Sequence, residues 1–365
     1  MPVDVRTAPL EAAVQLYDHY ESIAEVKAYY GLLAIYGLAR TAQDGDDEEL
    51  WDRVERILRR FPDEIDHPRY NFPSYRIGGI PQAFAVARGR MPDRAEAVRE
   101  YAEELLTAPR DAAGILVMPR TADLNQIWID AAMAASMYLV FAGQALDERR
   151  YFDEAVHQTV AMYDEFLDPS NGLLHQCKNF VGPGLLSEDH WSRGNGWGYI
   201  ALTELVAGLP EDHPRRPDVL ERFVALSAAM LPHQSERGLW RQEINDPHAW
   251  EESSGTALIL YGYGLGLRLG VLDEATYGEA FRLGIAGLAA HAINEDGSTE
   301  LSCPGCLCPG EGEAKGTVAA YLAKEPYRDE PHSFGPFMLA LVEAHLNGVD
   351  RVALGARDRT TGDPS

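Results

Sequence analysis

Two kinds of helical pattern alternate along the 365-residue chain, and this alternation constrains its fold more than any other feature. Segments of the first kind place apolar residues on one stripe. In "YFDEAVHQTVAMYDEF" the stripe contains Phe152, Val156, Met162, Tyr163 and Phe166. Segments of the second kind, such as "WIDAAMAASMYLVFAG", are apolar nearly all round. A helix that is apolar on every side must be surrounded by protein, whereas a helix with one apolar stripe covers a core from outside. The sequence therefore predicts inner helices packed inside outer ones.

The loops between these helices also repeat. "DPSNGLLHQ", "SERGLWRQ" and "NEDGSTELS" contain Gly172, Gly238 and Gly297, which are separated by 66 and 59 residues. A helix pair about every 60 residues is an internal repeat, and the chain has room for about six pairs. We expect inner helices near residues 25–40, 77–88, 128–144, 196–208, 254–269 and 334–346, and the segment 8–22 as the sixth outer helix.

Six inner and six outer helices make an all-α (α/α)6 barrel, which we predict to be a single domain over residues 1–350. An open superhelix of helix pairs is the alternative architecture. The inner segments are too apolar to line an exposed concave face, which favours the closed barrel. Residues 351–365 are polar, and we expect them to form a disordered tail.

The overall charge restricts the partners of the protein. The formal net charge is −25, and Lys27, Lys178, Lys315 and Lys324 are the only lysines. Such an acidic surface repels nucleic acid and anionic membranes. It fits a protein kept soluble in high salt, although a GC-rich genome would also replace lysine by arginine.

The sequence also bears on the cellular compartment. It contains no run of about 18 uncharged apolar residues that would span a membrane, and no basic patch followed by an apolar stretch at its start. Four cysteines in a chain of this length do not make a disulfide framework. We therefore expect a cytoplasmic protein, either a monomer or a homodimer.

In such a barrel, the starts of the inner helices and the loops that feed them gather at one mouth. Four stretches place polar or aromatic residues there, just ahead of an apolar segment. They are "QIWIDAAM", "HWSRGNGW", "WEESSGTA" and "RDEPHSFGPF". We interpret the glycines of the second stretch as allowing a loop to turn tightly into an inner helix. Candidate functional residues are therefore sought in these four stretches.

Asp130 is the first candidate, because it stands in a helix otherwise built of Ile, Ala, Met and Trp. An Asp there costs helix propensity and desolvation. It could cap the helix instead, but Trp128 and Ile129 precede it in the same apolar register. A carboxyl group in an apolar, aromatic pocket has a raised pKa and can donate a proton near neutral pH, as a general acid must.

Arg193 lies between two tryptophans and could bind a carboxylate with its forked guanidinium group. The alternative is a salt bridge to Glu188 or Asp189. Trp191 and Trp197 could stack on a sugar ring or fill the core. Both interpretations stay open from the sequence alone.

The remaining candidates give weaker signals. His175, in a rim loop, could bind substrate or serve a structural role. Glu251 and Glu252 precede Ser254 at a helix start, where capping is the expected role. "CPGCLC" offers Cys303, Cys306 and Cys308, but it lacks a fourth ligand and the spacing of a standard zinc finger. We therefore predict no metal site and no cofactor.

The motifs together resemble a known enzyme family. The combination of "QIWIDAAM", "GLLHQ", "HWSRGNGWGYIAL", "ESSGTALILYGYG" and "PHSFGPFMLALVEAHL", in this order over residues 110–347, is similar to unsaturated uronyl hydrolases of glycoside hydrolase family 105 and the related family 88. The resemblance implies the (α/α)6 barrel. It also implies removal of a 4,5-unsaturated uronic acid from the non-reducing end of lyase-generated oligosaccharides, by hydration of the vinyl ether.

The resemblance also implies residue roles. Asp130 matches the catalytic acid, His175 a substrate-binding histidine, and Arg193 the arginine that faces the uronate carboxylate. Trp191 and Trp197 match the aromatic walls of the pocket. The full predicted substrate-binding set is His175, Trp191, Arg193, Trp197, Ser254, His332 and Arg76.

Two departures from the family pattern touch the substrate rim. "YNFPSYRIGG" lacks the Asp that many relatives carry before the second inner helix, and "AAGILVMPRTADLNQIW" lacks their glycine-glycine-aromatic stretch ending in His. The parent polysaccharide therefore stays open. A sugar epimerase or polysaccharide lyase, using histidines from among His175, His190 and His332, is one alternative. A non-catalytic carbohydrate-binding relative is another.

Overall fold

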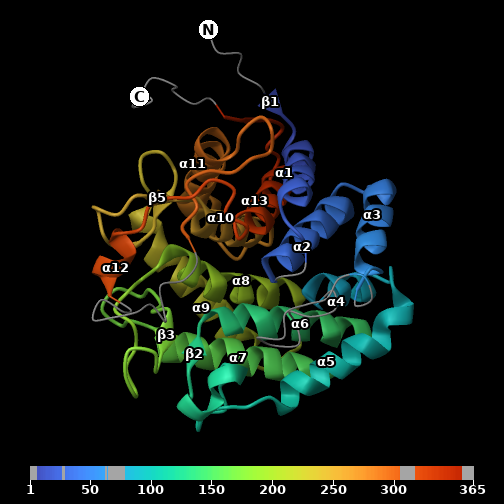
Figure 1. Ribbon diagram of the computed structural model, residues 1–365, viewed down its shortest axis with the longest axis vertical. Coiled ribbons are helices and arrows are strands. Elements are labelled where there is room, and N and C mark those ends of the chain that lie inside the picture. The colour runs from blue at the N-terminus through green and yellow to red at the C-terminus, as the bar shows by residue number, and fades with distance from the viewer. Residues whose placement is uncertain (1–5, 27–28, 62–63, 65–78, 305–316, 356–365) are drawn as a thin grey trace.

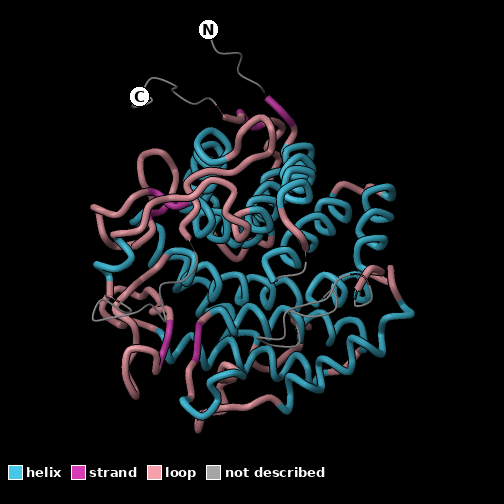
Figure 2. The backbone as a smooth tube through the Cα atoms, in the orientation of Figure 1, coloured by secondary structure: helices cyan, strands magenta, loops and turns pink. Residues whose placement is uncertain are grey.

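In the computed structural model of the protein, the described residues are 6–26, 29–61, 64, 79–304 and 317–355. Helices make up most of this part of the chain, and each of its strands is two residues long (Figure 2). Most of the connecting loops collect on one side of the molecule, together with the short strands β2, β3 and β5 (Figure 2). This side contains the candidate site.

Six helices form a closed inner ring. Each contacts the next along the chain, and the last contacts the first, so that the ring closes between α13 and α2. The inner helices are α2 (Tyr29–Asp44), α4 (Gly79–Ala87), α6 (Asp130–Leu146), α8 (Ser192–Gly208), α10 (Ser253–Arg268) and α13 (Phe334–Leu346). The predicted closed barrel is confirmed, and the open superhelix is wrong.

In the described part of the chain, six further helices surround this ring. Each packs on an inner helix that is its neighbour along the chain, and α1 also packs on α13, the last inner helix. Figure 1 shows α6, α7 and α8 side by side in the lower half of the molecule. The outer helices are α1 (Pro9–Ile23), α3 (Glu48–Leu58), α5 (Ala95–Thr107), α7 (Arg149–Phe166), α9 (Arg216–Met230) and α11 (Glu274–Ala292).

Short elements connect the two rings. They are the 3-10 helices η2 (Pro92–Arg94), η3 (Pro119–Leu124) and η4 (Leu231–His233), helix α12 (Val318–Leu322), and the strands β1 (Arg6–Thr7), β2 (Ile127–Trp128), β3 (Cys177–Lys178), β4 (Trp240–Arg241), β5 (Glu251–Glu252) and β6 (Val352–Ala353). The strands form three antiparallel pairs, β1 with β6, β2 with β3, and β4 with β5.

The burial patterns explain which helices lie inside. In α6 every residue from 131 to 143 is buried, so that no face is left for solvent. Helix α3 buries only one stripe, and the side chain of Asp47 caps it by accepting from the backbone N–H of Leu50 at 2.9 Å. The hydrophobic pattern of each segment thus decides its ring.

The predicted loop repeat is confirmed. Gly172, Gly238 and Gly297 have φ values of 78°, 86° and 79°, in the left-handed region that favours glycine. Each closes the same kind of turn between an outer and an inner helix. At Gly238 a side chain is also excluded by space, because a Cβ atom would lie 2.3 Å from the carbonyl oxygen of Leu283.

The prediction for the start of the fourth inner helix is wrong. Helix α8 begins at Ser192 rather than near residue 196, so the glycines of "SRGNGWG" lie inside the helix and not in a loop. Their role is close packing: a Cβ atom at Gly196 would lie 2.6 Å from Cδ1 of Leu258 on α10. The early start brings Arg193 onto the first turn of an inner helix.

The two ends of the described chain meet in the β1–β6 pair, where Arg6 pairs with Ala353 and Thr7 with Val352. The region predicted as a disordered tail therefore begins with a paired strand, while residues 356–365 lie outside the described residues. No helix in the described part of the chain is long and apolar enough to cross a membrane.

Candidate active site

Asp130 is the first residue of α6, at the mouth of the barrel. The backbone just before it is held by the β2–β3 pair, where the N–H of Ile129 donates to the carbonyl of Gln176 at 2.9 Å. Burial raises the pKa of Asp130 to about 6, and Asp189 adds to this, whereas a backbone hydrogen bond and Arg193 oppose it. The carboxyl group can therefore hold a proton close to neutral pH.

Several buried polar atoms at this mouth lack hydrogen-bond partners among the described residues. They are Oδ2 of Asp130, Nδ1 of His175, Nε of Arg193 and Nε1 of Trp128 and Trp197. Buried polar groups in folded proteins are normally paired, so a cluster of unpaired ones needs an explanation. A polar ligand bound at the mouth would supply the missing partners.

Arg193 is held by partners from three other segments. Its Nη1 donates to Oγ of Ser254 at 3.2 Å and to the carbonyl of Cys303 at 3.0 Å, and its Nη2 donates to the carbonyl of Pro304 at 3.0 Å. The charged partner is Glu330, whose Oε2 lies 3.1 Å from Nη1. The predicted alternative partners, Glu188 and Asp189, are therefore wrong. Nε of Arg193 has no partner in the part of the chain that the structure describes.

Glu330 joins Arg193 to His332. Nδ1 of His332 lies 2.5 Å from Oε1 of Glu330, and Nε2 of His332 contacts the hydroxyl of Tyr29. Burial opposes the charge of Glu330, but His332 and Arg193 together lower its pKa to about 2. Glu330 is thus an ionised, buried carboxylate that links two predicted substrate-binding residues.

Glu252 organises the starts of two inner helices. It caps α10 by accepting from the backbone N–H groups of Ser254 and Gly255 at 2.9 and 2.6 Å, which confirms its predicted capping role. Its Oε2 also accepts from Oγ of Ser192 on α8 at 2.9 Å. Ser254, the predicted substrate-binding residue, thus lies between Glu252 and Arg193.

The two tryptophans of the α8 stretch are both buried. Trp191 is 1% exposed, Arg193 lies over its ring at 4.7 Å from the centroid, and its Nε1 donates to Sγ of Cys303 at 2.9 Å. Trp197 is 0% exposed and belongs to the main hydrophobic core. The aromatic wall is therefore one guanidinium group and one indole ring stacked together.

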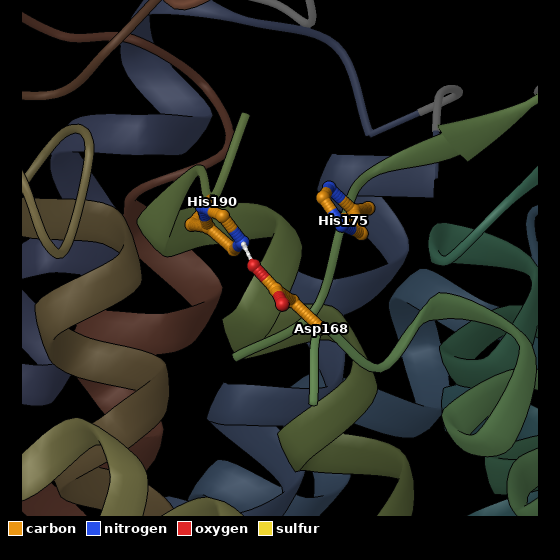
Figure 3. Close-up of side chains that lie close together, drawn as sticks. All are labelled: Asp168, His175 and His190. Atoms are coloured by element: carbon orange, nitrogen blue, oxygen red, sulfur yellow. Dashed lines mark hydrogen bonds and ion pairs between the residues drawn. The ribbon is translucent and has the colours of Figure 1, made fainter. Parts of the chain in front are cut away.

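Asp168, His175 and His190 form a separate cluster on the segments between α7 and α8 (Figure 3). Nε2 of His190 lies 3.1 Å from Oδ2 of Asp168, and the two imidazole rings lie 4.7 Å apart between centroids. Burial lowers the pKa of both histidines, so both rings are neutral at pH 7. His175 directly precedes Gln176, whose carbonyl accepts from the N–H of Ile129 next to Asp130.

A buried pair of carboxyl groups, Asp189 and Glu243, lies behind this cluster. Both side chains are 0% exposed, and Glu243 accepts from the backbone N–H of His190 at 2.8 Å. Burial raises the pKa of both groups, and their mutual repulsion raises that of Glu243 further. One of the two carboxyl groups therefore holds a proton at neutral pH.

The structure gathers seven of the eight predicted site residues near the starts of the inner helices. The eighth, Arg76, lies outside the described residues, as do Cys306 and Cys308, while Cys303 is buried beside Trp191. Sequence reasoning missed Glu330, although it stands in the quoted stretch "RDEPHSFGPF". It also missed Asp168, for which the position two residues after α7 in a repeated loop was the available signal.

The chain is similar in sequence to a known enzyme family and to several curated proteins. The model of Glycosyl Hydrolase Family 88 matches residues 13–347. An unsaturated rhamnogalacturonyl hydrolase of Bacillus subtilis is 27% identical over 172 residues, which are 44% of this chain and 48% of that protein. An unsaturated 3S-rhamnoglycuronyl hydrolase of Formosa agariphila is 28% identical over 180 residues, which are 47% and 48% of the two chains. The match thus spans about half the length of these curated relatives.

A solved structure extends the likeness to nearly the whole chain. A family 105 glycoside hydrolase of C. acetobutylicum superposes with a TM-score of 0.81 at 20% identity, covering 92% of this chain and 99% of that one. At this identity the superposition establishes the shared barrel fold.

Proposed function

Since the chain belongs to Glycosyl Hydrolase Family 88, we propose that it removes a 4,5-unsaturated uronic acid from the non-reducing end of an oligosaccharide. The resemblance to families 105 and 88 predicted from the motifs is confirmed. The observation that carries the proposal is the carboxyl group of Asp130, whose Oδ2 is buried at the mouth without a partner among the described residues and whose pKa is raised to about 6. A general acid for work near neutral pH needs these properties.

The proposed reaction is the hydration of a vinyl ether. Asp130 donates its proton to C4 of the C4–C5 double bond, and positive charge develops at C5 and the ring oxygen. The Asp130 carboxylate then takes a proton from a water molecule whose oxygen bonds to C5. The resulting hemiketal opens between C5 and the ring oxygen, and the hemiacetal left at C1 expels the remaining sugar. This route differs from the usual attack at the anomeric carbon by a pair of carboxyl groups.

The other residues are proposed to bind the uronate. Nε of Arg193 is the guanidinium donor left open for the substrate carboxylate, because Glu330 and two backbone carbonyls engage the rest of the group. His175 faces the same mouth from beside Asp130. Ser254 and His332 act in the network that holds Arg193. Arg76 stays a prediction from the sequence, as does the choice between monomer and homodimer.

The experiment that tests the proposal follows the ultraviolet absorbance of the double bond. Lyase-generated disaccharides from the pectin backbone, ulvan, glycosaminoglycans and xanthan-type chains would be offered at low and high salt. We expect absorbance to fall with one of these classes, and not to fall when Asp130→Asn replaces the wild type. An Asp130→Asn variant with full activity would contradict the proposal.

A second candidate, a sugar epimerase or polysaccharide lyase, has one observation in its favour. The rings of His175 and His190 lie 4.7 Å apart at the mouth, and such chemistry commonly uses paired histidines as acid and base. His332 is not part of this pair, because it is engaged by Glu330 and Tyr29. A lyase would raise the ultraviolet absorbance of a saturated substrate, whereas the proposed hydrolase leaves it unchanged.

A further inference from the structure

Asp168, His175 and His190 each offer one metal-ligating atom, and these atoms lie within 4.8 Å of one another (Figure 3). We propose that the three side chains bind one divalent first-row transition-metal ion, of which Zn²⁺ is the best match. Two imidazoles and one carboxylate are an established ligand set for Zn²⁺ that leaves a coordination position open. The three residues all lie on the connection between α7 and α8, so the ion would tie together separate turns of this one segment.

The spacing of the ligating atoms fits such an ion. Zn²⁺ lies about 2.0–2.1 Å from nitrogen and oxygen ligands, so tetrahedral ligands are roughly 3.4 Å from one another. Nε2 of His190 and Oδ2 of Asp168 are already 3.1 Å apart. The ligating atoms lie within 4.8 Å of one another, so the third ligand, from His175, has to approach by at most about 1.4 Å for tetrahedral coordination.

Two acceptor atoms of the cluster already converge on one donor. The amide Nδ2 of Asn171 donates to Oδ2 of Asp168 at 2.9 Å and lies 3.2 Å from Nε2 of His190. The amide nitrogen of Asn171, the carboxylate of Asp168 and the imidazole of His190 thus meet at one place, with the amide as the third polar group. A metal ion would replace the amide as that group.

All three groups are in the form that binds a metal at neutral pH. Burial lowers the pKa of His175 and His190, so both rings have a free lone pair. Hydrogen bonds from Ser170 help to lower the pKa of Asp168 below its usual range despite partial burial, so that it is ionised. Nδ1 of His175 is buried and has no partner among the described residues.

The neighbours also hold the ligands in place. The backbone N–H of Ser170 donates to Oδ1 of Asp168 at 2.8 Å, which leaves Oδ2 for the ion. The amide of Asn245 lies 3.4 Å from Nδ1 of His190, at the ring nitrogen opposite the proposed ligand atom. Such outer partners fix the ring orientation of metal-ligating histidines.

A pair elsewhere in the molecule serves as an internal comparison. Nε2 of His213 lies 3.1 Å from Oδ1 of Asp153, the same spacing as in the proposed site. Within the described residues no third ligating side chain joins this pair. We therefore expect His213 and Asp153 to bind no ion.

The test is a titration of the full chain, first stripped with a chelator, with Zn²⁺ in competition with a chromophoric chelator. One equivalent should bind, and Zn²⁺ should raise the melting temperature. His190→Gln and His175→Gln should each weaken binding by at least about tenfold, and His213→Gln should leave it unchanged. Circular dichroism and the melting temperature without metal verify that each variant is folded.

A Co²⁺ spectrum identifies the ligands independently. The proposed site predicts weak d–d bands without the intense thiolate-to-metal bands of cysteine ligation. Absence of Zn²⁺ binding, equal binding by His190→Gln and wild type, or thiolate bands would overturn the proposal. Metal binding is measured without substrate, so these outcomes leave the proposed hydrolase function untouched.

Discussion

The two ends of the inner helices differ in how their buried polar side chains are paired. At the mouth, the starts of these helices carry Asp130, Arg193 and Trp197, each with a buried polar atom that has no partner among the described residues. At the opposite end, Arg40, Glu204 and Glu343 are also buried, yet within the described chain none of their fully buried polar atoms lacks a hydrogen-bond partner. The same barrel thus has an incomplete polar network at one end and a complete one at the other.

The complete network is built from the last turns of the inner helices. Oε1 of Glu204 accepts from the hydroxyls of Tyr36 and Tyr261, each at 2.7 Å. Arg40 donates to Tyr261 at 2.6 Å and forms an ion pair with Glu343 at 3.5 Å. Tyr36, Arg40 and Glu204 are among the residues that line a cavity of about 260 Å³. Because its polar lining is already satisfied, we interpret this end as structural.

The difference teaches how to tell a structural polar network from a functional one. Removing one member of a complete buried network exposes the others to an uncompensated desolvation penalty, so it lowers stability. Removing a group that is unpaired in the free protein relieves such a penalty and lowers activity instead. The variants that follow test this contrast.

The largest effect is expected from Asp130→Asn at the mouth. Loss of the general acid should lower kcat by about 10²- to 10⁴-fold. The pKa of Asp130 is about 6 in the folded state and 3.8 in an ordinary environment. The folded state therefore loses stability as pH rises from about 4 to above 6, because the carboxyl group ionises more readily in the unfolded chain. The variant should therefore unfold at pH 7 with a free energy roughly 1–3 kcal/mol higher than wild type.

Urea unfolding and the absorbance assay measure these two quantities. Asp218→Asn is a matched control, since Asp218 also lies in the first turn of a helix, α9, but far from the mouth. The Asp218→Asn substitution should leave both kcat and the free energy of unfolding close to the wild-type values. An Asp130→Asn variant that lost both activity and stability would mean that the carboxylate is a structural group.

The opposite result is expected from Glu343→Ala at the complete end. Glu343 is 0% exposed and pairs with both Arg268 and Arg40, so its removal leaves Arg268 without its carboxylate and Arg40 with that of Asp44 alone among the described residues. We expect the free energy of unfolding to fall by about 3–5 kcal/mol. The kcat of the folded fraction should stay unchanged. Glu274→Ala, at an exposed ion pair with Arg282, should cost less than about 1 kcal/mol.

Glu330→Gln tests the ion pair between Glu330 and Arg193, which connects the site to the fold. The pKa of Glu330 is lowered to about 2, so its stabilising effect is complete above pH 4.5 and is lost as pH falls toward 2. At pH 7 the free energy of unfolding of the wild type should exceed that of the variant by roughly 3 kcal/mol. This difference should become smaller below pH 4.5. A gap that did not depend on pH would show that the charge of Glu330 is not what stabilises Arg193.

The smallest effect is expected in the pH dependence of the wild-type enzyme. If Asp130 must be protonated to act, kcat/KM should be level below its pKa of about 6 and fall by about tenfold per pH unit above it. Glu343→Gln should keep the same midpoint, because it lies at the other end of the barrel. A midpoint near 4 would assign the proton to a carboxyl group in an ordinary environment.

Part of the site was predictable because its signals are local. Asp130 stands out as a charged residue in an apolar helix, and Arg193 as a charged residue between two tryptophans. In both cases the signal lies within a few residues of the side chain itself. The true charged partner of Arg193 is Glu330, which lies 137 residues further along the chain. Such pairing depends on how the loop before α13 approaches the start of α8, and no pattern in either segment specifies it.

The sequence by itself determined the number, order and orientation of the helices, because apolar periodicity decides which faces must be buried and the repeated glycine turns set where each pair ends. It also marked the end of the barrel that carries the site. Only the tertiary structure decided which polar groups are paired, since burial and hydrogen bonding are set by neighbours distant in sequence. It therefore separated the unpaired carboxyl of Asp130 from the paired ones of Glu330 and Glu343, and it brought Asp168, His175 and His190 together.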